Sequence, residues 1–169
     1  MRATTSLCLS SIGIALFVAD LRIRTEARRH QGLPKVAFAR ITGFDAGFDE
    51  PLAWDEADPP TGRVPRRVQA LDGKSFALEG YMQPLEYDEN DSSRVRQFLL
   101  TELPVGCCAG HVPRMQDYVL VTMDGEGADV IPLTSCLVEG RFALEPWIDD
   151  EGDVLVLFQM RSSRVRRGR

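Results

Sequence analysis

Short apolar segments separated by turn residues succeed one another through the second half of the chain. We expect strands at residues 75–82, 95–100, 118–123 and 154–160, with one or two more between 131 and 144. These segments are rich in β-branched and aromatic residues, which alternate with polar ones or run on continuously. Glycine, proline and aspartate stand between them, and no segment has the period of an amphipathic helix. Five or six strands at this spacing predict an all-β domain, built as a small antiparallel barrel or sandwich.

A different pattern marks the N-terminus, where residues 3–19 carry no charge and are strongly apolar. As a helix they would span about 25 Å, slightly less than the hydrocarbon core of a bilayer. Arg2 is typical of a signal peptide, whereas the arginines from Arg22 onward disfavour translocation of the segment that contains them. We therefore expect residues 1–30 to be a signal peptide or membrane anchor, with residues 4–19 as the membrane segment. The protein is then exported, periplasmic or membrane-anchored; a misassigned start would make it cytoplasmic.

Residues 31–65, between the leader and the strands, are predicted to form an irregular arm. Glycines and prolines break any long element there, but Phe44 and Trp54 are too apolar for a plain linker. We expect the arm to pack across the domain, which we place at residues 66–162.

Composition and charge narrow the function. The hydrophobic share of 44% and the charged share of 27% are those of one globular domain, and the net charge is −5. Five arginines lie between Arg161 and Arg169, and we expect residues 163–169 to be a solvated basic tail. The negative total argues against a general nucleic-acid-binding protein, since phosphate contacts need a cationic surface. We therefore expect no nucleic-acid partner.

The densest candidate chemistry lies in nine residues, Gly-Cys-Cys-Ala-Gly-His-Val-Pro-Arg. They hold two of the four cysteines and one of the two histidines of the chain. Thiolates and imidazole bind metals, form disulfides or attack electrophiles. Glycines allow the tight backbone that would bring such groups together. We treat this segment as a binding loop whose framework residues are Gly106, Gly110, Pro113 and Arg114.

Three interpretations of the cysteines remain open. Cys107, Cys108, His111 and Cys136 could hold a metal such as zinc or copper, although no Cys-x-x-Cys pair is present. Cys107 or Cys108 could instead form a disulfide with Cys136, which an oxidising compartment would favour. The cysteines could also be reduced, buried and structural. No cofactor is certain under any of the three.

Catalysis has less support from the sequence. In hydrolases a catalytic cysteine and its histidine usually come from distant parts of the chain, and a third group orients the histidine. Nothing in the sequence orients His111, and a Ser-His-Asp triad would have to use this same histidine. We therefore predict that the protein is not an enzyme.

Several short motifs follow one another in a fixed order: Leu71-Asp72-Gly73-Lys74, Gly80-Tyr81-Met82-Gln83-Pro84-Leu85, Gln97-Phe98-Leu99-Leu100, Gly106-Cys107-Cys108-Ala109-Gly110 and Val138-Glu139-Gly140. Together with Trp54-Asp55 before them, they resemble a bacterial family of exported domains of unknown function, with the pattern LDGK…GYMxPL…FLL and then a Cys-rich loop. The match covers residues 54–161. Many members carry a Cys-x-His-x-Pro-Pro loop, from which the loop of this chain departs.

This resemblance implies an OB-like small barrel in a periplasmic or membrane-attached setting, and no known catalytic activity. Genes of the family often accompany ABC-type permeases, in some bacteria under zinc-responsive control. We therefore expect an exported, non-enzymatic binding or accessory module whose partner is a membrane permease or another envelope protein. The alternative is a metal-binding or thiol-redox protein that uses the Cys-Cys-x-x-His loop.

Overall fold

The computed structural model describes residues 32–45, 47, 52–104 and 114–168. The chain divides into two units, Met1–Gly32 and Leu33–Arg169, and every described helix and strand belongs to the second. No helix among the described residues is long and apolar enough to cross a membrane. The predicted membrane segment, residues 4–19, lies outside them.

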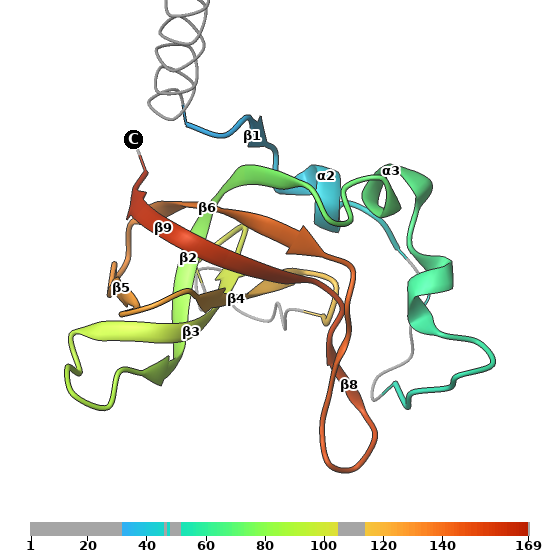
Figure 1. Ribbon diagram of the computed structural model, residues 1–169. Coiled ribbons are helices and arrows are strands. Elements are labelled where there is room, and N and C mark those ends of the chain that lie inside the picture. Colours follow the sequence, from blue (N-terminus) through green and yellow to red (C-terminus); the bar gives the residue numbers. More distant parts are fainter. Residues whose placement is uncertain (1–31, 46, 48–51, 105–113, 169) are drawn as a thin grey trace, which may run out of the picture. The chain divides into compact units, whose positions relative to one another are not determined.

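Five strands close into a barrel (Figure 1): β2 (Ser75–Tyr87), β3 (Arg94–Thr101), β4 (Tyr118–Met123), β6 (Ser135–Ala143) and β9 (Gln159–Arg167). β2 pairs with β3 and with β6, β3 pairs with β4, and β9 pairs with β6, all antiparallel. The ring closes through a parallel pair between β4 and β9. This is the strand order of an OB fold, a five-stranded Greek-key barrel. The prediction of an all-β, OB-like barrel is therefore confirmed.

β2 is long enough to serve two neighbours. It pairs with β6 from Ser75 to Tyr81 and with β3 from Tyr81 to Tyr87. The strand continues beyond Met82, where the sequence pattern predicted its end, and includes Pro84. A proline is tolerated there because β2 pairs on one edge only at that point, and the pairing register shifts directly after it.

Short elements complete the second unit. β1 (Lys35–Val36) pairs in parallel with β2, and β5 (Ala128–Asp129) pairs with β3. β7 (Trp147–Ile148) and β8 (Val154–Val156) form a separate hairpin. The helical turns are α2 (Ala39–Thr42), the 3-10 turn η1 (Pro60–Arg63) and α3 (Arg66–Gln69).

The arm before the barrel packs against it, as its apolar residues led us to expect. Phe38, Ile41 and Val64 are buried in the same core as the barrel strands. Phe44 sets its ring edge against Phe158, with the ring centroids 6.3 Å apart. Burial of these side chains holds an otherwise irregular segment in place.

Side chains fill the inside of the barrel. Large apolar side chains such as Phe76 and Leu78 of β2 occupy inward positions two residues apart and are fully buried. The ring of Phe142 lies between two others, its centroid 5.5 Å from that of Phe76 and 5.8 Å from that of Phe158. Further buried members of this core are Phe98, Leu100, Val119, Val121, Cys136, Val138 and Met160.

Two glycines allow strands to approach closely. A Cβ at Gly80 would lie 2.5 Å from the carbonyl oxygen of Thr101, and one at Gly140 would lie 2.3 Å from that of Arg161. Neither distance is possible between real atoms, so a larger residue at either position would push two strands apart.

The C-terminal strand differs from the sequence prediction. The sequence pattern predicted that the last strand ends at residue 160 and that residues 163–169 form a solvated tail. In the structure, β9 continues to Arg167 and stays paired with β6. Two features explain the difference: β6 offers an edge along its whole length, and Val165 packs against the core. The arginines of the predicted tail up to Arg167 are thereby fixed on a barrel strand.

Candidate functional site

Most of the predicted binding loop lies outside the described residues. Eight of its nine residues, 106–113, belong to the segment that is not described, among them Gly106, Cys107, Cys108, Gly110, His111 and Pro113. The metal site and the disulfide therefore stay predictions. Of the predicted site residues, the structure describes Cys136 and Arg114.

Cys136 lies inside the barrel. It is on β6, opposite Gly80 of β2 and Arg167 of β9, has no exposed surface and carries a free thiol. Burial raises the pKa of this thiol to about 12. At neutral pH the thiol is therefore protonated, and a protonated thiol is a poor nucleophile and a poor metal ligand. In this state of the chain, Cys136 is a buried structural cysteine.

The barrel holds both ends of the loop. Thr101, the last residue of β3, pairs with Tyr118, the first residue of β4. The Thr101 hydroxyl donates a hydrogen bond to the carbonyl oxygen of Leu103 at 2.7 Å. On the return side, the Arg114 N–H donates to Asp117 Oδ2 at 2.9 Å, and the Asp117 N–H donates to the Arg114 carbonyl at 2.8 Å. The connection from 102 to 117 therefore leaves and re-enters the barrel at one fixed pair.

The guanidinium of Arg114 lies at the surface. It is 3.5 Å from the Asp117 carboxylate and 3.6 Å from Asp45 of the arm. This exposed end of the predicted binding loop is thus close to both the barrel and the arm, and it is accessible to a partner.

A buried amide oxygen without a hydrogen bond lies beside the loop. Gln116 is 1% exposed, and its Oε1 accepts no hydrogen bond from any described residue. Leaving such a group unpaired costs roughly 1–3 kcal/mol. A donor from the loop or from a bound molecule would be accommodated at this oxygen.

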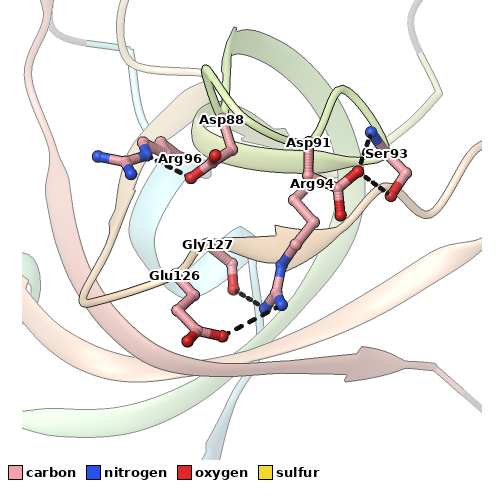
Figure 2. A network of polar contacts seen from close by, with 7 residues as sticks. All are labelled: Asp88, Asp91, Ser93, Arg94, Arg96, Glu126 and Gly127. Carbon is pink, nitrogen blue, oxygen red and sulfur yellow. Dashed lines mark hydrogen bonds and ion pairs between the residues drawn. The ribbon is translucent and has the colours of Figure 1, made fainter.

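An open cleft of about 530 Å³ lies between the β2–β3 turn and the β4–β5 turn. Charged side chains of both turns and of β3 line it: Asp88, Asp91, Arg94, Arg96 and Glu126. Figure 2 shows Arg96 directed at Asp88, and Arg94 directed at Glu126. We name this group the polar cleft. It is a cavity among the described residues in which several titratable groups converge.

Neighbouring groups lower the pKa values of two aspartates of the polar cleft, Asp88 and Asp91. The N–H of Asn90 and then the guanidinium of Arg96, whose Nε is 2.7 Å from Asp88 Oδ2, lower the pKa of Asp88. The hydroxyl and the N–H of Ser93 lower the pKa of Asp91. These are turn contacts in which an aspartate accepts from the backbone two residues further on.

Arg94 joins the two turns of the polar cleft. Its guanidinium donates to the carbonyl oxygen of Gly127 at 2.8 Å and lies 3.4 Å from the Glu126 carboxylate. Its Nε is buried and has no partner among the described residues. Nearly every charged group of the cleft is thus paired within it. The arrangement is suited to fastening two turns together, and it shows no nucleophile activated by a base.

The structure also brings three acidic groups of the β7–β8 turn together. The side-chain oxygens of Asp149, Glu151 and Asp153 lie within 4.8 Å of one another. Asp149 accepts hydrogen bonds from the N–H groups of both other residues, at 3.0 and 2.9 Å. These local bonds account for the cluster as a turn.

Sequence reasoning missed the role of Arg94. The aspartates of the β2–β3 turn carry a recognisable turn signature, but the contact between Arg94 and Gly127 joins residues that are distant in sequence. No local pattern announces such a pair, because it forms only when β3 and the β4–β5 turn are brought together by the barrel.

No protein-family model matches the chain, and no curated protein matches it. Two solved structures are similar. A DUF3299 family protein from Pseudomonas aeruginosa PAO1 is 23% identical with a TM-score of 0.57, over 82% of this chain and 98% of that chain. The OB domain of a protein from Methanosarcina mazei is 13% identical with a TM-score of 0.34, over 57% of this chain and 74% of that chain. The first likeness covers most of the chain and agrees with the fold described above.

Proposed function

We propose that the chain is an exported, non-enzymatic binding or accessory module of the bacterial envelope, and that it acts together with a membrane permease. We also propose that it belongs to the family of unknown function that its motifs resemble. The similar structure from Pseudomonas aeruginosa is itself a member of a family of unknown function, which is in keeping with this proposal.

One observation carries the proposal: the described barrel is filled with side chains, while the connection between β3 and β4 begins and ends at one fixed strand pair. The packed core leaves binding to the outside of the barrel. The connection from 102 to 117 starts and ends at the pair of Thr101 and Tyr118. Connections of about this length on a rigid scaffold usually have a function.

The experiment is a triple substitution, C107A/C108A/H111A, in the full chain. The proposal expects association with a permease subunit in detergent-solubilised membranes of the native bacterium to be lost, with thermal stability retained because both loop ends stay paired. A D149N/E151Q/D153N variant in the β7–β8 turn serves as the control and should still associate. Association that survives in the loop variant would contradict the loop as the contact point.

The alternative is a metal-binding or thiol-redox protein, and the register gives it one supporting observation. Tyr81 pairs with Thr101 on one edge of β2 and with Ser135 on the other. Cys136 therefore lies one residue from the row at which the loop leaves the barrel. Zinc or copper would need Cys136 as a thiolate, which its burial disfavours.

Elemental analysis combined with a thiol count on the full chain separates the two. Stoichiometric zinc or copper that is lost in Cys108→Ser supports the alternative. A bridge from Cys136 to Cys107 or Cys108 without metal rules out the metal site.

A further inference from the structure

β9 makes one outer face of the barrel basic (red strand in Figure 1). Residues that pair across strands lie on the same face of a sheet. Arg164 and Arg166 pair with Glu139 and Leu137 of β6, and Arg161 pairs with Arg141. All four arginines are exposed. The four arginines outnumber the two carboxylates of this face, Glu79 and Glu139, although the whole chain has a net charge of −5.

The pair of Arg141 and Arg161 has no internal explanation. Two like charges directly opposite each other destabilise a sheet. Neither guanidinium makes a hydrogen bond or ion pair with another side chain in the part of the chain that the structure describes, in contrast to Arg166, which donates to Glu139 at 2.7 Å. An anion outside the protein would neutralise such a pair.

An exposed leucine adjoins the end of this basic strand. Leu133 is 94% exposed and has a φ of 56°, a backbone conformation that leucine rarely adopts. Two residues later, the carbonyl oxygen of Ser135 accepts a hydrogen bond from the Gly168 N–H at 2.7 Å. Leu133 therefore presents an apolar side chain to solvent beside the C-terminal end of β9.

The chain also enters the barrel at this place. Lys35 of β1 forms an ion pair with Glu79, and the Ser135 hydroxyl donates to Glu79 at 3.0 Å. Ser135 in turn holds the end of β9 through Gly168. The strand that comes after the predicted membrane segment and the end of the basic strand are thus joined through one carboxylate.

We propose that this face binds the surface of an anionic lipid bilayer; we call it the basic face and define it as Arg141, Arg161, Arg164, Arg166 and Leu133. The guanidinium groups contact lipid phosphates, and Leu133 enters the interface between headgroups and acyl chains. An acidic protein would satisfy the arginines, but it would not account for an apolar side chain exposed beside the end of β9. The anionic bilayer repels the acidic remainder of the protein, so the basic face is the side that docks.

This inference rests on the proposed membrane setting, and its test separates the two. The full chain is mixed with vesicles of phosphatidylcholine, or with vesicles in which about a third of the lipid is phosphatidylglycerol. Flotation reports membrane insertion, and hydrogen exchange of residues 131–134 and 163–168 reports docking. We expect insertion into both vesicle types, with slower exchange of these two segments only where phosphatidylglycerol is present.

The matched variants change charge equally on two faces. R161Q/R164Q removes two arginines that have no ion-pair partner among the described residues, and it leaves Arg166 to pair with Glu139. R40Q/R66Q removes two exposed arginines from α2 and α3. Since each arginine near an anionic surface contributes about fivefold to binding, the first variant should lower the docking equilibrium constant, measured as protection from exchange, about thirtyfold. The second should behave like the unchanged protein.

A third variant, Leu133→Asn, keeps the charge and fits the left-handed backbone. It should weaken docking without lowering thermal stability. If the protein inserts but its exchange protection does not depend on phosphatidylglycerol, docking through the basic face is wrong, while the membrane setting still holds. Equal effects of the two double variants on this protection would lead to the same conclusion. Failure to float with either vesicle would count against the membrane setting, and protection by phosphatidylglycerol without flotation on neutral vesicles would support the basic face alone.

Discussion

Replacement of Gly140 by alanine tests the crossing of β6 and β9. A Cβ at this position would lie 2.3 Å from the carbonyl oxygen of Arg161 and 2.9 Å from Cγ of Met160. The first neighbour is backbone, so β9 itself must move by about 1 Å to reach ordinary contact. Overpacking of this kind costs typically about 1–3 kcal/mol and sometimes more. Because a paired strand must shift, we expect Gly140→Ala to lower the free energy of unfolding by about 3 kcal/mol.

Urea denaturation followed by circular dichroism measures this change, with Gly62→Ala as the control. A Cβ at Gly62 meets no atom within 4 Å, so that variant should stay within about 0.5 kcal/mol of the unchanged protein. If Gly140→Ala were also within about 0.5 kcal/mol, the close approach of β6 and β9 would be wrong. The continuation of β9 to Arg167, and with it the basic face, would then lose its foundation.

Three further predictions concern single groups. The first uses a variant in which Cys136 is the only cysteine; the pKa of this thiol is about 12, against 9.0 for an ordinary thiol. At pH 8 the folded variant should therefore react with a disulfide reagent about a thousandfold more slowly than the same chain unfolded in urea. Equal rates would contradict the burial of Cys136. The hydrogen bond from Lys35, and after it that from Ser135, lowers the pKa of Glu79. The Glu79 carboxylate therefore stabilises the fold above its ordinary pKa of 4.5, and this stabilisation is lost as the pH falls through the folded-state pKa. In thermal melts, Glu79→Gln should be less stable than the unchanged protein at pH 7 and should match it in strong acid. Gln116→Met removes the unpaired buried oxygen and should be neutral or stabilising by up to about 2 kcal/mol in urea denaturation, whereas a loss of more than about 1 kcal/mol would mean that the amide has a partner.

Much of the fold is visible in the sequence because the barrel strands are short, apolar and bounded by turn residues. The run from Tyr118 to Met123 was predicted to the residue. The end of β2 was missed because Pro84 reads as a breaker, and only the pairing with β3 shows that the proline is tolerated. The end of β9 was missed because a run of arginines reads as a solvated tail, while the edge of β6 that holds it is distant in sequence.

The candidate sites were visible to a smaller degree. The sequence pointed to Cys136 as a partner of the loop, and the structure places it in the barrel core, one residue from the strand row at which the loop leaves. The polar cleft and the basic face depend on contacts across strands. Neither Arg94 with Gly127 nor Arg141 with Arg161 has a local signal, because strand pairing alone brings them together.

The central claim is that the chain binds a membrane permease through the connection between β3 and β4. A photo-reactive amino acid placed at Arg114, which is exposed at the end of the predicted binding loop, tests this in intact cells of the native bacterium. The same substitution at Asp150, exposed in the β7–β8 turn, is the control. The account predicts a cross-link from position 114 to a permease subunit identified by mass spectrometry, and none from position 150. Cross-links to the same protein from both positions, or from neither, would contradict it.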